Sequence, residues 1–155
     1  MSAETPLDIE VKVDDIGLMS KSMRSYLRAQ LAFKDGDMNT MDEEVKWLSN
    51  QIFQASQEVE GDGISMCAAG TSRYAPSENA INSAKVVIAQ MQGLKALIAD
   101  NDDLFETHMK EAVALEDQTN YPTGPPRITK PSFEQYGEWL LTKDKPALAL
   151  EQFEK

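Results

Sequence analysis

The segment KDGDMNTMDEEVKW has the residue types of a calcium-binding loop. An EF-hand loop places oxygen ligands at alternate positions, a glycine at the sixth position and a bidentate glutamate at the twelfth. Asp35, Asp37 and Asn39 fit the first three ligand positions. Counting from Asp35, however, Thr40 occupies the glycine position and Lys46 occupies the position of the last carboxylate. The lysine would place a cation in the ligand shell, so we expect no metal site here.

The same segment suits a turn between two helices. Gly36 can adopt positive φ after a first helix, and Thr40 with Glu43 has the capping-box spacing of a new helix start. This interpretation accounts for every residue of the segment. A calcium-responsive loop remains the alternative, which a response to the cation would reveal.

The other side chains that could do chemistry lack partners in the sequence. His108 is the only histidine and has no neighbour that would make an activated pair. Cys67 has no cationic neighbour before Arg73, whereas a nucleophilic thiol needs a lowered pKa. The surrounding GDGISMCAAGTS lacks the lysine and the preceding strand of a phosphate loop. The acidic DNDD at 100–103 suits capping of a helix N-terminus, with cation binding as the alternative. We predict no catalytic residues, no cofactor and no enzymatic activity.

The composition restricts the partners. Of the 155 residues, 26 are acidic and 15 basic, and the formal charge of −11 disfavours nucleic acid and anionic membranes. Basic or neutral partners are favoured, although acidity also serves solubility alone. No run of about 18 apolar residues predicts a membrane span. The N-terminus lacks the pattern of a secretory signal, and the single cysteine is compatible with a reducing compartment. We expect a cytoplasmic protein, with a secreted protein whose signal has been removed as the alternative.

Apolar residues recur every three or four positions along most of the chain, which predicts an all-α fold. The predicted helices form three antiparallel hairpins in a single domain, 1–155, and the hairpins cover about 14–60, 77–117 and 132–155. Their turns are predicted at Gly36, Asp100 and Asp144. Ser132 with Gln135 has capping-box spacing, Asp103 and Glu106 suit the start of the fourth helix, and Pro146 suits a first helical position.

Two segments between the hairpins have no helical period. Residues 61–76 are rich in small and turn residues and predict a loop. Residues 118–131, QTNYPTGPPRITKP, contain four prolines and a glycine, which exclude regular structure. Because proline restricts the backbone, we expect the second segment to be a fixed, extended strap rather than a flexible linker.

The last segment, PSFEQYGEWLLTKDKPALALEQFEK, resembles a tetratricopeptide repeat (TPR), an antiparallel helix pair with large and small residues in a set order. The residues that match this order are Phe133, Tyr136, Gly137, Leu140, Ala149 and Phe153. Small residues at Gly137 and Ala149 would let the two backbones approach closely, while the aromatic and leucine side chains fill the surrounding space.

The resemblance weakens toward the N-terminus. Gly93, Phe105 and Met109 repeat the spacing of the last hairpin, but Phe105 is large where a small residue is expected. The matching positions of the first hairpin are Ala29, Ala32, Met41 and Val45. The upstream repeats are therefore degenerate, and their register is not fixed by the sequence.

The resemblance implies a TPR-like array of about three hairpins, an α-solenoid fragment, whose first helices line a concave groove. It implies a non-enzymatic interaction module or scaffold that binds a peptide or a partner protein. The implied partner-binding residues are Gln30, Phe33, Lys34, Leu94, Leu97, Ile98, Glu138, Leu141 and Thr142. Their apolar members fit the core equally well. A mixed apolar and acidic groove would suit an extended or helical peptide with a basic flank.

A second hypothesis is a structural subunit that assembles with itself. The predicted sixth helix is about one turn short and has no polar capping helix after it, whereas a solenoid needs its terminal apolar face covered. The chain would then be a fragment of a longer array, or its last hairpin would be covered by another copy or another protein. Head-to-tail contacts between copies would give rings or filaments.

Overall fold

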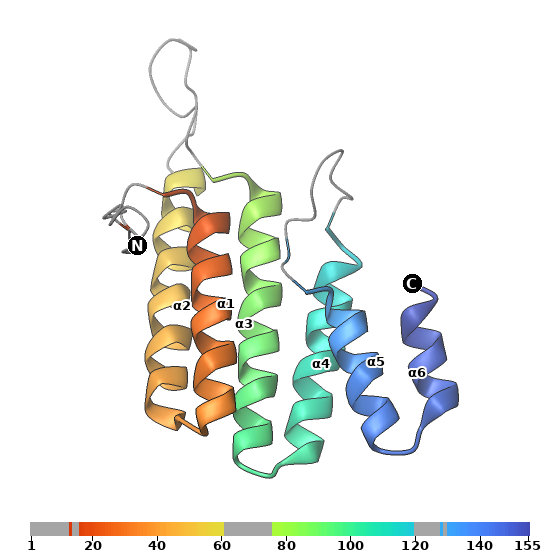
Figure 1. The fold of residues 1–155 in the computed structure, drawn as a ribbon. Coiled ribbons are helices and arrows are strands. Elements are labelled where there is room, and N and C mark those ends of the chain that lie inside the picture. The colour runs from red at the N-terminus through yellow and green to blue at the C-terminus, as the bar shows by residue number, and fades with distance from the viewer. Residues whose placement is uncertain (1–12, 14–15, 61–75, 120–127, 129) are drawn as a thin grey trace, which may run out of the picture.

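A computed structural model describes residues 13, 16–60, 76–119, 128 and 130–155. These ranges contain six α-helices and no strand, so the all-α prediction is confirmed for them (Figure 1). The helices are α1 (Leu18–Asp35), α2 (Met38–Glu60), α3 (Glu78–Ile98), α4 (Asp102–Glu116), α5 (Ser132–Thr142) and α6 (Pro146–Phe153). No described helix is both long and apolar enough to cross a membrane. Most of the predicted loop, including Cys67, and most of the proline-rich segment lie outside the described residues.

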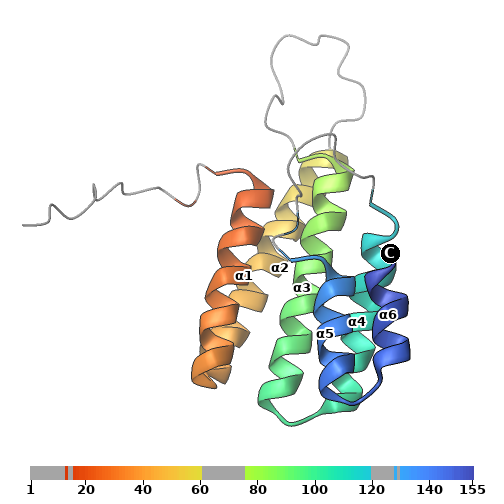
Figure 2. The ribbon, with the colours of Figure 1, turned by 45° about the vertical axis from the view of Figure 1, so that its right-hand side comes forward.

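Consecutive helices pair, α1 with α2, α3 with α4 and α5 with α6, and the pairs follow one another in a row (Figure 1). The helix α3 packs against both helices of the first pair, and α5 packs against α4. In both views α1 and α5 stand on either side of α3 (Figure 2). A hydrogen bond from Tyr26 of α1 to Gln135 of α5 shows that these two helices approach each other, although they are far apart in the sequence.

The three predicted turn residues take the left-handed conformation. The φ angles are 66° at Gly36, 51° at Asp100 and 57° at Asp144. At Gly36 this conformation costs little, since glycine has no Cβ. The two aspartates adopt this conformation at some cost in free energy, because residues with a Cβ normally avoid it.

The start of α2 differs from the prediction. The side chain of Asp37 caps the helix, because its Oδ1 accepts the backbone N–H groups of Asn39 and Thr40, each at 3.1 Å. The hydroxyl of Thr40 donates to the same carboxylate. The predicted Thr40–Glu43 capping box is therefore wrong, since the chain is already helical from Met38. The Asp37 carboxylate, offered above as a calcium ligand, holds the helix start instead.

The predicted capping box at the start of α5 is also wrong. Ser132 is the first helical residue, so its side chain is not in the position from which a serine caps. Its N–H group donates to the carboxylate of Glu116 at 2.6 Å. The helix α4 begins at Asp102 and is capped by Asn101, slightly before the predicted start. Pro146 occupies the first turn of α6 as expected.

Among the described residues two apolar clusters make the core, and α3 contributes to both. The first joins α1, α2 and α3, and the second joins α3, α4, α5 and α6. Ile128, from the proline-rich segment, is buried in the second cluster. The amide of Gln90 on α3 donates to the carbonyl of Lys130 at 2.7 Å. The described residues before α5 are thus held against α3.

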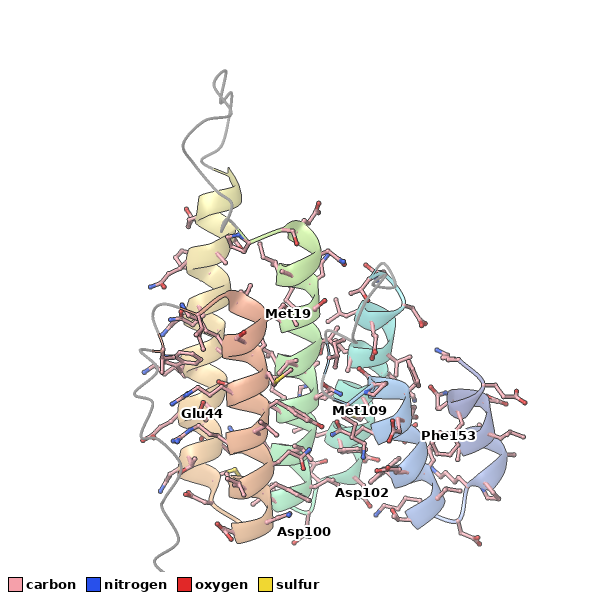
Figure 3. The ribbon with its side chains drawn as sticks, turned by 45° about the horizontal axis from the view of Figure 1, so that its top comes forward. Met19, Glu44, Asp100, Asp102, Met109 and Phe153 are labelled. Atoms are coloured by element: carbon pink, nitrogen blue, oxygen red, sulfur yellow. The ribbon has the colours of Figure 1, made fainter. Side chains whose placement is uncertain are left out.

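A glycine of α3 and a glycine of α5 make equivalent contacts. A Cβ at Gly93 would lie 3.2 Å from the sulfur of Met109, and one at Gly137 would lie 2.5 Å from the ring of Phe153 (Figure 3 labels both partners). The repeated spacing seen in the sequence therefore corresponds to a repeated contact. Phe105, the large residue in the small position, directs its ring toward the next hairpin, where it lies 4.8 Å from the ring of Trp139.

Candidate functional site

A groove of about 470 Å³ is lined chiefly by α1, α3 and α5, which Figure 2 labels. Its floor includes Phe105 of α4, and Lys130 and Lys143 lie just outside the two ends of α5. The residues that line it are Gln30, Phe33, Leu94, Leu97, Phe105, Lys130, Gln135, Glu138, Trp139, Thr142 and Lys143. We call this hollow the α1–α3–α5 groove. A smaller hollow, of about 350 Å³, lies between α2, α3 and α4.

The structure brings six of the nine residues implied by the resemblance to this groove. They are Gln30, Phe33, Leu94, Leu97, Glu138 and Thr142. The other three do not line it. Lys34 is exposed near the end of α1, Ile98 packs against the first core cluster, and Leu141 is 51% exposed. Leu94 is buried in the first core cluster and also lines the groove, so it fits both the core and the groove interpretation.

A chain of hydrogen bonds spans the groove from α1 to α5. The amide of Gln30 donates to the hydroxyl of Tyr26 at 2.8 Å, and that hydroxyl donates to Oε1 of Gln135 at 3.0 Å. Burial raises the pKa of Tyr26 to about 12, while the bond from Gln30 opposes this and Glu138 and Glu134 add to it. The tyrosine therefore stays protonated and fixes the Gln135 amide with its nitrogen turned away from the bond.

Two buried N–H donors at the groove have no partner among the described residues. They are Nε2 of Gln135 and Nε1 of Trp139, and each of these two residues is only 7% exposed. The Trp139 ring is held by Phe105 and Tyr136, whose ring centroids lie 4.8 and 6.0 Å away. Buried donors are normally satisfied, because an unpaired one costs about 1–3 kcal/mol. Both nitrogens are buried, so an acceptor in the groove would pair with them only after the side chains that cover them move.

Charges of both signs surround these donors. Lys130 forms an ion pair with Glu138, and Lys143 forms one with Asp102 of α4. The ammonium groups of Lys143 and Lys145 also lie 5.5 and 5.8 Å from the centre of the Trp139 ring. The groove is thus apolar along α3, with paired charges along α5, and has no strong net charge of its own.

Sequence reasoning missed the two donors although a signal was present. Gln135, Glu138, Trp139 and Thr142 are spaced by three or four positions and so share one face of α5. Sequence reasoning had assigned a binding role only to Glu138 and Thr142 of this face. The hydrogen bond from Tyr26 to Gln135 joins residues 109 positions apart, and no local pattern could predict it.

The remaining candidates for chemistry are less organised. Nδ1 of His108 lies 3.7 Å from the carboxylate of Glu111, one turn along α4. In the described ranges no group of three or more His, Cys, Asp or Glu side chains is placed to hold a metal ion.

No protein-family model matches this chain, and no curated protein or solved structure is similar enough to it to count as a match.

Proposed function

We propose that the chain is a TPR-like array of three helical hairpins that binds an extended segment of a partner protein in the α1–α3–α5 groove. The row of helix pairs and the repeated glycine contacts at Gly93 and Gly137 support the repeat architecture. In such an array the first helix of each pair faces one side, which is where the groove lies. The activity is binding, without chemistry.

The two unpaired donors carry the proposal. An extended peptide presents backbone carbonyl groups along its length, with a rise of about 3.3 Å per residue. Once the side chains that cover these buried nitrogens move aside, one carbonyl would accept from Nε2 of Gln135 and another from Nε1 of Trp139. Each new bond would remove the cost of a buried donor that no described residue pairs, and that gain would contribute to the binding energy.

The rest of the groove defines the ligand further. Phe33 and Leu97 are partly buried and offer apolar contact to one or two side chains of the peptide. Glu138 is exposed, and a basic side chain of the ligand would compete with Lys130 for its carboxylate. The formal charge of −11 also favours an approaching basic or neutral segment. The proposed ligand is an extended, partly apolar peptide with a basic flank.

Selection from a peptide library tests this function directly. Random peptides displayed on phage would be selected on the immobilised full chain, and one synthetic peptide that is enriched would then be titrated in solution. The protein has two tryptophans, so Trp47→Phe leaves Trp139 as the only indole and as a reporter inside the groove. We expect saturable binding that changes the Trp139 emission.

A matched pair of variants locates the binding. Thr142 and Thr107 are exposed helical threonines whose hydroxyls both donate to a backbone carbonyl of the preceding turn. Thr142→Arg places a bulky side chain in the groove and should weaken the peptide at least about tenfold, a loss of roughly 1.4 kcal/mol. Thr107→Arg, on α4, should leave the affinity unchanged. A peptide that binds both variants equally would show that the ligand site lies elsewhere.

A further inference from the structure

The helix α1 exposes a line of large apolar side chains away from its core. Met23, Leu27 and Leu31 are spaced by four residues and are 42%, 51% and 61% exposed. Residues four apart share one side of a helix, so the three form a continuous stripe. The buried face of α1, which includes Tyr26 and Ala29, points in another direction. We call this exposed stripe the N-terminal face.

The helix α3 shows what such a second apolar face does inside the molecule. Its residues Ile81 and Met91 pack in the first core cluster, while Val86 and Ala96 pack in the second. Two apolar faces therefore serve a helix that lies between two hairpins. The helix α1 also has two apolar faces, but within the described residues a hairpin covers only one of them.

The last hairpin exposes apolar side chains at the opposite end of the row. Leu141 of α5 and Leu150 and Phe153 of α6 are 51%, 57% and 43% exposed. Leu150 and Phe153 are three residues apart and share one side of α6. In α6, all of which the structure describes, only Ala149 is buried. We call these three residues the C-terminal face.

The charges near the C-terminal face are acidic. The three lysines of residues 132–155 all contact acidic groups of α4 or of its C-cap, Lys143 with Asp102, Lys145 with Glu106 and Lys155 with Asp117. The exposed acids Glu134, Glu151 and Glu154 have no ion-pair partner among the described residues. The lysines are thus turned inward, toward α4, and negative charge remains outside.

The charges near the N-terminal face are basic. Although the whole chain is acidic, α1 contains Lys21, Arg24, Arg28 and Lys34 and only one acid, Asp35. Arg24 and Arg28 share the single buried carboxylate of Glu44, which also accepts a hydrogen bond from Ser25 at 2.8 Å (Glu44 is labelled in Figure 3). Two guanidinium groups on one carboxylate leave an excess of positive charge.

We propose that the N-terminal face of one copy docks on the C-terminal face of a second copy. The contact joins an apolar stripe with basic neighbours to an apolar patch with acidic neighbours, and opposite charges favour this pairing over the pairing of like faces. It would place α1 of one copy against α5 and α6 of the next, as α3 packs on the first hairpin. Because the two faces differ, the contact is heterologous and leads to rings or filaments. It is independent of a groove ligand.

Solution mass over a concentration series, from micromolar to millimolar, tests the assembly with three variants. Leu27→Glu/Leu31→Glu disables the N-terminal face, and Leu141→Lys/Leu150→Lys disables the C-terminal face. Phe53→Glu is the matched control, because Phe53 is 66% exposed on α2 and lies outside both faces. All the substituted side chains are exposed, and unchanged thermal unfolding by circular dichroism would show that each variant folds.

We expect the mass of the wild-type chain and of Phe53→Glu to rise with concentration, while each double variant stays at the monomer mass. An equimolar mixture of the two double variants should form a dimer and no larger species, because one intact face of each kind remains. Added salt should weaken every association. A wild-type chain that stays monomeric throughout would overturn the proposal, as would a mixture that stays monomeric. Loss of association in the N-terminal variant alone would also overturn it, by showing a symmetric contact between two α1 helices.

Discussion

The middle hairpin, α3–α4, and the last hairpin, α5–α6, share an internal contact but differ in their surroundings. Gly93 faces Met109 in the middle hairpin, and Gly137 faces Phe153 in the last one. Met109 is completely buried, whereas Phe153 is 43% exposed. The contact between the two helices is thus fully buried in the middle hairpin, whereas in the last hairpin it is partly exposed to solvent.

This difference shows that position in the row, more than local sequence, sets how much a hairpin contributes to the core. The helix α3 has neighbours on both sides and belongs to both clusters, whereas α6 packs chiefly on α5. In a row of stacked hairpins each unit is stabilised by its neighbours. The open hairpin should therefore have the lower local stability and exchange its amide hydrogens first.

Alanine substitutions of the two glycine-facing residues give the largest expected contrast. Met109→Ala removes a fully buried side chain and should cost about 2–5 kcal/mol. Phe153→Ala should cost only about 1–2 kcal/mol, because part of the ring is already in water. Urea unfolding followed by circular dichroism measures both losses. Equal losses would contradict the view that the two contacts differ in their surroundings.

The bond between Tyr26 and Gln135 links the first hairpin to the last, and its removal sharpens the comparison. Tyr26→Phe leaves Oε1 of Gln135 buried without a donor and should cost about 1–3 kcal/mol. The amides of α5 should lose protection from hydrogen exchange more than those of α4. A uniform loss over the whole chain would instead mean that the bond supports only the common core.

Alkaline pH should act on the same link. Burial raises the pKa of Tyr26 to about 12, above the ordinary value near 10, so the folded chain holds this proton more tightly than the unfolded chain. The stability that this proton provides is complete below pH 10 and is lost as the pH rises through 12. The loss from Tyr26 is on the order of 1 kcal/mol per pH unit in that window. Tyr26→Phe should make this loss of stability with pH less steep. Part of the loss should remain, because burial also raises the pKa of Tyr136 to about 12.

Alanine at the two glycines should give smaller effects, a loss of stability at Gly93 and little net change at Gly137. A Cβ at Gly93 would meet Met109 at 3.2 Å and Phe105 at 3.4 Å, both in the closed core, so Gly93→Ala should cost about 1–2 kcal/mol. A Cβ at Gly137 would meet the Phe153 ring at 2.5 Å, but this ring is at the open end and can move. The gain in helix propensity, about 1 kcal/mol, should offset that loss in global stability. Faster exchange in α6 would mark the displaced ring.

The local features of this fold could be predicted from the sequence, while those that depend on distant contacts could not. The turns at Gly36 and Asp144 follow from helical periods that stop at these residues. The helix starts were wrong at Thr40 and Ser132, because a side chain caps only when its own residue lies just outside the helix.

The candidate site divides in the same way. Gln30, which the resemblance implied as a binding residue, lines the groove, whereas Ile98 and Leu141, implied in the same way, pack against the core and lie exposed outside the groove, respectively. The unpaired donors of Gln135 and Trp139 emerge only when α1 and α5 meet, since the bond from Tyr26 determines which Gln135 atom stays unpaired. The chemistry of the groove is therefore a property of the packed helices.

The smallest predicted effects come from the two turn aspartates and test whether the last hairpin responds on its own. Asp100 and Asp144 both have positive φ, and each follows the C-terminus of a helix, where a carboxylate is unfavourable. Replacement by glycine should therefore relieve a similar cost at both sites, about 0.5–1 kcal/mol. In the enclosed middle hairpin, Asp100→Gly should raise the global free energy of unfolding by this amount in urea. In the open hairpin, Asp144→Gly should raise the hydrogen-exchange protection of α6 with little change in the global transition, because α6 opens locally before the core unfolds. If both variants shift the urea midpoint equally, the last hairpin unfolds together with the middle one, and the contrast between them is structural only.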